Sequence, residues 1–146
     1  MPIFGLLFAV LSLFGCAPRI SQASSPPTSP AAVVRSYYAA INAHKFRQAY
    51  GLWGGNGAAS RQTLGDFTAG FKETESVAVK VGKPGRIEGA AGSRYVTIPV
   101  TISAMTTGGK AQRFSGRYTL RRTVVDSATA KQRRWHLYSA DISATQ

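Results

Sequence analysis

Between about residues 30 and 71 the apolar side chains recur every three or four positions, which is the period of an amphipathic helix. In the first expected helix these positions are Val34, Tyr37, Tyr38 and Ile41. Ser29 precedes this helix as a side-chain cap, and Pro30 suits its first turn because no amide hydrogen is needed there. The pattern therefore predicts a helix that begins at Pro30 and buries one aromatic face.

Two shorter helices are expected to follow. The apolar positions of the second helix are Phe46, Ala49, Tyr50 and Trp53. A pair of glycines that begins at Gly54 stops this helix. The third helix begins near Thr63, which forms a capping-box-like pair with Asp66. The first half of the chain is thus predicted to be helical.

From about residue 75 the period changes to two, which is typical of half-buried strands. The first strand carries Val77, Val79 and Val81 on one face and resumes at residues 86–88. Longer strands are expected over residues 93–106, 112–125 and 133–142, with a hairpin turn at 107–110. Pro99 cannot donate a ladder hydrogen bond, so we expect an edge, a bulge or a broken pair there. Three helices followed by a four-stranded antiparallel meander make an α+β arrangement.

Two aromatic helix motifs in this order resemble those of the NTF2-like superfamily, which includes SnoaL-like and ketosteroid-isomerase-like proteins. They are Ala-Val-Val-Arg-Ser-Tyr-Tyr-Ala-Ala-Ile-Asn in the first helix and Ala-Tyr-Gly-Leu-Trp in the second. The resemblance covers residues 30–143. It implies a cone in which a curved sheet wraps the three N-terminal helices and leaves a pocket at its open end. Some members of the superfamily use this pocket for catalysis, and many use the fold for binding or assembly.

The N-terminal segment has the character of an export signal. Residues 3–14 form an uncharged apolar run of 12, shorter than the about 20 residues that span a bilayer. The run ends in Leu-Phe-Gly-Cys, and Cys16 is the single cysteine of the chain. This tetrapeptide resembles the lipobox of bacterial lipoproteins, which implies that Cys16 carries the acyl chains, palmitate among them. The alternative is a buried, inert thiol.

These features divide the chain into three parts. Residues 1–15 are expected to be a lipoprotein signal peptide, residues 16–29 a lipidated cysteine with a Ser/Pro-rich tether, and residues 30–146 the NTF2-like domain. The resemblance to lipoproteins implies a membrane-anchored location in the cell envelope. Because Ala17 is not an aspartate, it implies the outer membrane, facing the periplasm, if the source is diderm.

The composition is strongly basic. The chain has 18 Lys and Arg residues against six Asp and Glu residues, a net charge of +12. Such a charge favours anionic partners, here lipid head groups or an anionic envelope polymer, and export argues against nucleic acid. The alternative is a solvated basic surface without a specific ligand.

Several aromatic residues are candidates for a ligand pocket, with a plain hydrophobic core as the alternative. They are Tyr38, Trp53, Phe71, Tyr118 and Trp135. Asp141 alternates with the last of these, so it either points into the cone or pairs with a neighbouring arginine. Asp66 is better explained as a helix cap.

Other chemistry has little support in the sequence. No group of His, Cys, Asp and Glu has metal-ligand spacing, and there is neither a G-x-S-x-G elbow nor a Walker A loop. We therefore assign no metal, no cofactor and no catalytic residue.

Three arginines form a stripe on the strand expected over residues 112–125. Arg113, Arg117 and Arg121 occupy one face of it, with Ser115 and Thr119 between them. Guanidinium groups in a row bind phosphates or carboxylates well, which makes the stripe a candidate anion-binding surface. The alternative is the ordinary solvent face of a strand.

Three functions remain. The first is a non-catalytic, lipid-anchored envelope protein whose domain binds a small apolar ligand, a partner protein or a second copy of itself. The second is a SnoaL-like or ketosteroid-isomerase-like enzyme, with Asp141 or Asp66 as the base and Tyr38 or Tyr118 as the hydrogen-bond donor. The third is an assembly component of a secretion or cell-wall complex. The lack of a clear catalytic set favours the first.

Overall fold

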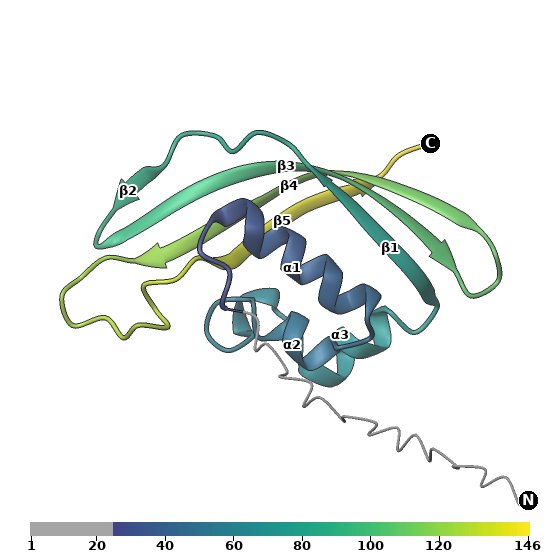
Figure 1. Ribbon diagram of the computed structural model, residues 1–146, viewed down its shortest axis with the longest axis horizontal. Helices are drawn as coiled ribbons and strands as arrows, with labels where there is room; N and C mark the ends of the chain where they lie inside the picture. The colour runs from purple at the N-terminus through teal and green to yellow at the C-terminus, as the bar shows by residue number, and fades with distance from the viewer. Residues whose placement is uncertain (1–24) are drawn as a thin grey trace, which may run out of the picture.

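An open antiparallel sheet of five strands carries three helices on one of its faces (Figure 1). The computed structural model describes residues 25–146, so the expected signal peptide, the lipidation site Cys16 and most of the expected tether lie outside the described residues. The elements in chain order are α1 (Pro30–Asn42), α2 (Phe46–Tyr50), the 3-10 helix η1 (Ala58–Ser60), α3 (Leu64–Gly70), β1 (Thr74–Val81), β2 (Glu88–Ala90), β3 (Ser93–Thr106), β4 (Ala111–Thr123) and β5 (His136–Ala144). The chain is therefore an α+β protein, as its pattern predicts.

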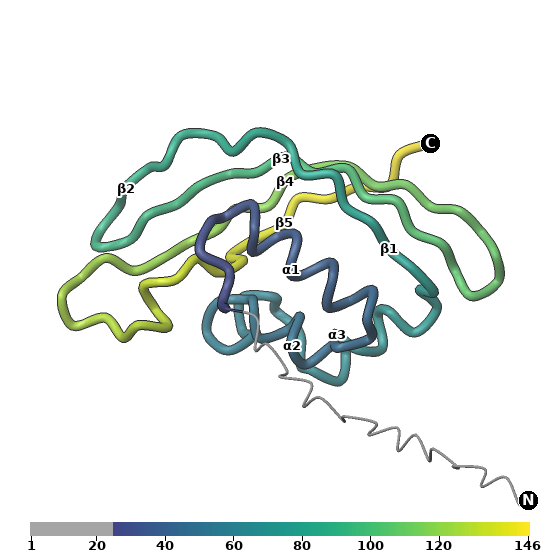
Figure 2. Tube along the Cα trace, in the orientation of Figure 1, coloured from purple at the N-terminus to yellow at the C-terminus, as the bar shows by residue number. Residues whose placement is uncertain are grey.

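The strands follow the order β1-β3-β4-β5, and the short β2 pairs with β3 beyond the end of β1. The sheet bends around the helices, which lie together on its inner face (Figure 1). The hairpin turn at 107–110 and the loop at 124–135 project from opposite ends of the sheet (Figure 2). The bend gives the sheet a helix-covered inner face and a bare outer face.

The starts of two helices are confirmed as predicted. The Oγ of Ser29 accepts a hydrogen bond from the amide of Ala32 at the start of α1. At the start of α3, Thr63 Oγ1 accepts from the amide of Asp66 at 3.1 Å and donates to its carboxylate at 2.8 Å. Because the bonding groups lie within three residues of each other, the sequence alone specifies both caps.

The second helix is shorter than its apolar spacing predicts, and the expectation that it includes Trp53 is wrong. Helix α2 ends at Tyr50, and Trp53 instead forms a bridge with Leu137. The amide of Leu137 donates to the carbonyl of Leu52, and its own carbonyl accepts from the amide of Gly54, both at 2.9 Å. The backbone of this segment thus bonds to β5, which ends the helix.

The sheet has five strands where four are expected, because the chain leaves β3 at Pro99. The ladder between β1 and β3 ends at the pair Val81 and Val100, and only single bonds follow, from Gly82 to the Pro99 carbonyl and from Gly85 to Thr97. The amide position of Pro99, which has no hydrogen, faces this gap. Pairing resumes as the separate strand β2. Of the edge, bulge or broken pair expected at Pro99, the structure shows the broken pair, on the side of β1.

The hydrophobic core lies between α1 and the inner face of the sheet. The fully buried side chains include Val33, Val34, Ile41, Val96, Ile98, Leu120 and Leu137. Along β3 the buried and exposed positions alternate over residues 96–102, so this strand contributes every second side chain to the core. Within residues 25–146 no helix is both long enough and apolar enough to cross a membrane.

Candidate functional site

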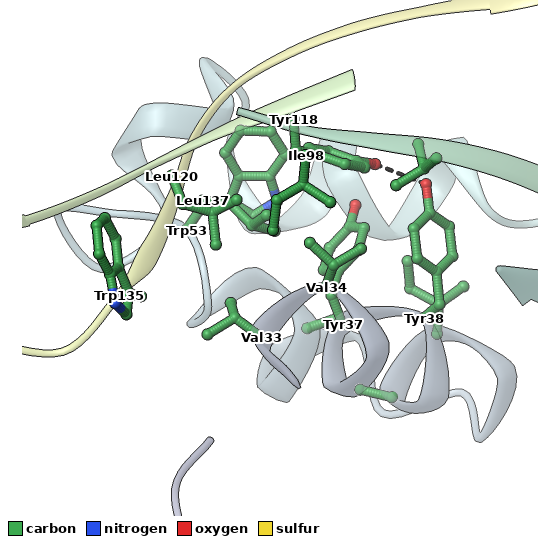
Figure 3. Packing of buried hydrophobic residues seen from close by; sticks show 14 of the residues in the cluster. Val33, Val34, Tyr37, Tyr38, Trp53, Ile98, Tyr118, Leu120, Trp135 and Leu137 are labelled. Carbon is green, nitrogen blue, oxygen red and sulfur yellow. Dashed lines mark hydrogen bonds between the residues drawn. The ribbon is translucent and has the colours of Figure 1, made fainter. Parts of the chain in front are cut away.

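The interior facing α1 is built from aromatic side chains, and a hydroxyl pair lies at its centre. Tyr38 on α1 and Tyr118 on β4 share a hydrogen bond of 2.6 Å between their hydroxyl oxygens (Figure 3). The ring of Tyr37 lies edge-on to Tyr38, Trp53 and Tyr118, with centroid distances of 5.0 to 6.1 Å. Such edge-to-face pairs stabilise the fold in addition to the stabilisation that comes from burying their apolar area. The aromatic rings themselves thus fill the space under the sheet.

Burial keeps these phenols protonated. Removal from water raises the pKa of Tyr38 and of Tyr118 well above the usual range for tyrosine, since a buried phenolate would lose its hydration. The pKa of Tyr37 rises for the same reason. Tyr38 and Tyr118 can therefore act only as neutral hydrogen-bonding groups at ordinary pH, and each already bonds the other.

No carboxylate accompanies these tyrosines. All six Asp and Glu residues of the chain lie within the described residues, and every one is exposed. Asp66 lies in the first turn of α3 and bonds the capping residue Thr63, as expected. Neither Asp66 nor Asp141 therefore lies among the buried aromatic residues, where the enzyme alternative needs a base.

Asp141 lies on the outer face of the sheet because of a bulge in β5. Thr119 pairs with Ser139 but Leu120 pairs with Leu137, so Tyr138 is an extra residue in the ladder. Strict alternation would place Asp141 on the face of Leu137, and the extra residue moves it to the opposite face. There its carboxylate lies 3.5 Å from the guanidinium of Arg117. The ion-pair interpretation, not the pocket interpretation, describes this residue.

The remaining candidate pocket residues belong to the core. Tyr38, Trp53, Tyr118 and Trp135 are at most 7% exposed, and only the first three lie together (Figure 3). Phe71 lies on the helical side, half-buried and stacked on Phe46 at a centroid distance of 5.9 Å. Four of these residues are therefore core, and Phe71 packs against that core from the helical side.

The arginine stripe lies on the outer face of β4, where its three members have different surroundings. Arg113 is exposed, and Arg117 faces Asp141. The guanidinium of Arg121 lies about equally far from the rings of Tyr95 and Tyr138, at 6.0 and 5.8 Å from their centroids. Its Nε also donates to Ser93 Oγ at 3.0 Å. The stripe is therefore not a row of three equivalent anion ligands.

The tyrosines that hold Arg121 are missing from the sequence-based candidates. Tyr95 and Tyr138 lie 43 positions apart and reach Arg121 from β3 and β5. The sequence could predict that two tyrosines flank this arginine only if the register of the β3–β4 and β4–β5 ladders were known. The bulge at Tyr138 removes that possibility, because it shifts the register by one residue.

The described residues hold no group of three or more His, Cys, Asp or Glu side chains with the geometry of a metal site. Comparisons of the chain with protein-family models, with curated proteins and with solved structures find no match.

Proposed function

We propose that this chain is a lipid-anchored, non-catalytic binding protein of the bacterial cell envelope, with an NTF2-like domain. The single observation that carries the non-catalytic part is the aromatic interior around Tyr38 and Tyr118, which is filled by rings and holds no carboxylate. The helices on one face of a bent antiparallel sheet support the NTF2-like assignment. The Leu-Phe-Gly-Cys motif that ends at Cys16 supports the lipid anchor.

An enzyme of the isomerase type needs a base beside its hydrogen-bond donor in a dry pocket. Here the donors Tyr38 and Tyr118 bond each other, and the two candidate bases, Asp66 and Asp141, lie at the surface. A substrate would have to displace buried aromatic rings to reach the hydroxyl pair. The enzymatic alternative is therefore the weaker one.

A filled interior directs binding to the surface of the domain. The surface is cationic, since 18 basic residues stand against six acidic ones. Its partner is accordingly an acidic protein or an anionic envelope polymer, reached from the membrane through the tether at residues 16–29. A small apolar ligand inside the cone is not favoured, because Tyr38, Trp53 and Tyr118 already occupy that space. An assembly component of a secretion or cell-wall complex would differ only in the identity of the partner.

The anchor is tested by replacing Cys16 with serine in cells that express the full chain. We expect the unchanged protein to enter the detergent phase on phase separation and the Cys16→Ser variant to remain unprocessed and unacylated. A processed Cys16→Ser protein that still enters the detergent phase would refute the lipoprotein assignment.

Partner binding is tested by crosslinking in intact cells, followed by purification of the tagged chain from envelope membranes. A partner whose recovery falls as salt rises would support cationic recognition. Recovery of nothing above the level of a tag-only control would contradict a binding function.

A further inference from the structure

A cleft with a volume of about 590 Å³ lies outside the aromatic interior and shares Arg121 and Tyr138 with the outer face. It is formed between the segment 54–59, which follows α2, and the adjoining ends of β4 and β5 with the loop that joins them. The lining side chains that matter here are Asn56, Arg121, Arg122, Lys131, Gln132 and His136. No residue of its lining is an Asp or a Glu.

Among the lining residues, Arg122 has a hydrogen-bond donor that is left without an acceptor within the described residues. Its guanidinium lies over the ring of Trp135, 5.0 Å from the centroid. Its Nε is buried and has no hydrogen-bond partner within the described residues. A buried N–H of a charged group without an acceptor is costly. An oxyanion against this guanidinium would supply that acceptor.

A second arginine stands opposite Arg122 in the sheet. Arg94 on β3 is its cross-strand partner, so the two side chains leave from the same face of neighbouring strands. Like charges in this position repel each other. Arg94 donates to the carbonyl of Ser93 at 3.1 Å, which satisfies one N–H, but among the described residues it forms no salt bridge. A bound anion would relieve this repulsion as well.

Lys131 brings a further cation from the loop between β4 and β5. Its Nζ donates to Oδ1 of Asn56, a neutral group, so the bond joins the two walls of the cleft without cancelling the charge. The one acidic residue of this loop, Asp126, is exposed and does not line the cleft. The positive charge of the cleft is therefore uncompensated by the residues that form it.

His136 lines the same cleft. Its Nδ1 donates to the carbonyl of Arg134 at 2.9 Å, which fixes the ring. Burial lowers the pKa of His136, and the charges of Lys131 and Arg134 lower it further. The two cations therefore add to the larger effect of burial in disfavouring a proton on His136.

We propose that this cleft binds the phosphate group of a phosphomonoester, with Arg122 and Lys131 as its principal ligands. A planar guanidinium offers two parallel N–H groups to an oxyanion, and an ammonium adds a point charge. The volume exceeds the requirement of a phosphate ion, so it leaves space for the organic part of the ligand. The inference goes beyond the proposed function, because it concerns a small-molecule site and holds whether or not Cys16 is acylated.

The test measures binding of two soluble probes, inorganic phosphate and glycerol 3-phosphate, to the purified full chain by calorimetry in a phosphate-free buffer. A third arm uses phosphatidylcholine vesicles with and without phosphatidic acid, which presents the same group on a lipid. Saturable binding in any arm that weakens at least tenfold in Arg122→Gln and Lys131→Gln supports the site. Binding of the soluble probes identifies a free ligand, and binding of the vesicles alone identifies a lipid head group.

The matched control is Arg113→Gln, which removes the same charge from an exposed position on the outer face of β4. We expect it to change binding less than twofold. Arg122→Lys keeps the positive charge but lacks the planar guanidinium. The affinity of this variant for the phosphate probes should therefore lie between those of the unchanged protein and Arg122→Gln. If Arg122→Gln does not fold, the test depends on Lys131→Gln, because Lys131 is exposed in a loop. Equal weakening by Arg113→Gln, or no saturable binding in any arm, would overturn the proposal.

Discussion

The hydroxyl of Tyr38 on α1 lies 2.6 Å from the hydroxyl of Tyr118 on β4, and this bond joins two elements 80 residues apart in the chain. The rings of Tyr37 and Trp53 pack around this bond. Removing either hydroxyl would leave the other buried without its partner, at a cost of about 1–3 kcal/mol. We therefore expect Tyr38→Phe and Tyr118→Phe each to lower the free energy of unfolding by this amount.

The double variant Tyr38→Phe/Tyr118→Phe separates the bond from the rest of the packing. Because neither hydroxyl is then left unpaired, its loss of stability should be clearly smaller than the sum of the two single losses. Urea unfolding of the four proteins measures the interaction. Strictly additive losses would show that the hydroxyl pair contributes nothing as a pair.

The ion pair between Arg117 and Asp141 should behave differently. Both side chains are mostly exposed, 64% and 74%, so water and salt weaken their attraction. In a cycle of Arg117→Ala and Asp141→Ala we expect an interaction free energy below about 1 kcal/mol. Urea unfolding at low and high salt provides the measurement, and a large, salt-independent interaction would contradict an exposed pair.

Gly116 is a position where the sheet tolerates no side chain. A β-carbon there would lie 1.9 Å from the carbonyl oxygen of Asp141 on the neighbouring strand, so the backbone of β4 or β5 would have to move. Overpacking of this kind typically costs about 1–3 kcal/mol, and Gly116→Ala should lower the thermal midpoint accordingly.

Gly70, at the end of α3, is the matched control, because a β-carbon there meets no atom within 4 Å. We expect Gly70→Ala to be neutral or to stabilise the protein by up to about 1 kcal/mol. A melting temperature for Gly116→Ala equal to that of Gly70→Ala would show that β4 and β5 are not as close as described.

His136 makes stability depend on pH. Its pKa in the folded protein lies below the ordinary value of 6.5, chiefly because of burial. The unfolded chain therefore takes up a proton first as the pH falls. The contribution of a neutral His136 is fully present above pH 6.5 and is lost as the pH falls from there through the folded-state pKa. We expect the free energy of unfolding to decrease across this window.

His136→Gln should flatten the dependence of stability on pH between about pH 7 and pH 5. His44→Asn is the control, because His44 is exposed and asparagine tolerates its left-handed backbone, with φ of 58°. Urea unfolding in a phosphate-free buffer series measures both variants. A pH profile that His136→Gln leaves unchanged would assign the dependence to other groups.

Local signals in the sequence account for much of the fold. The caps at Ser29 and Thr63, the strand over residues 93–106 and the turn at 107–110 lie where the pattern predicts them. The caps and the turn depend on groups a few residues apart. The strand depends on the alternation of its buried and exposed side chains. The sequence predicts the candidate sites less well, since four of the pocket candidates are core, Phe71 packs against that core, and Asp141 lies on the outer face of the sheet.

By itself, the sequence determined the α+β order, the helix starts, an irregularity at Pro99 and the excess of positive charge. The tertiary structure alone decided that Trp53 leaves its helix for β5, that Asp141 faces outward, and that Arg122 and Lys131 line one cleft. The physical reason is the range of the interactions. Caps and periodicity act over a few residues, whereas a bulge in β5 or a meeting of two loops depends on strand pairing between segments far apart in the chain.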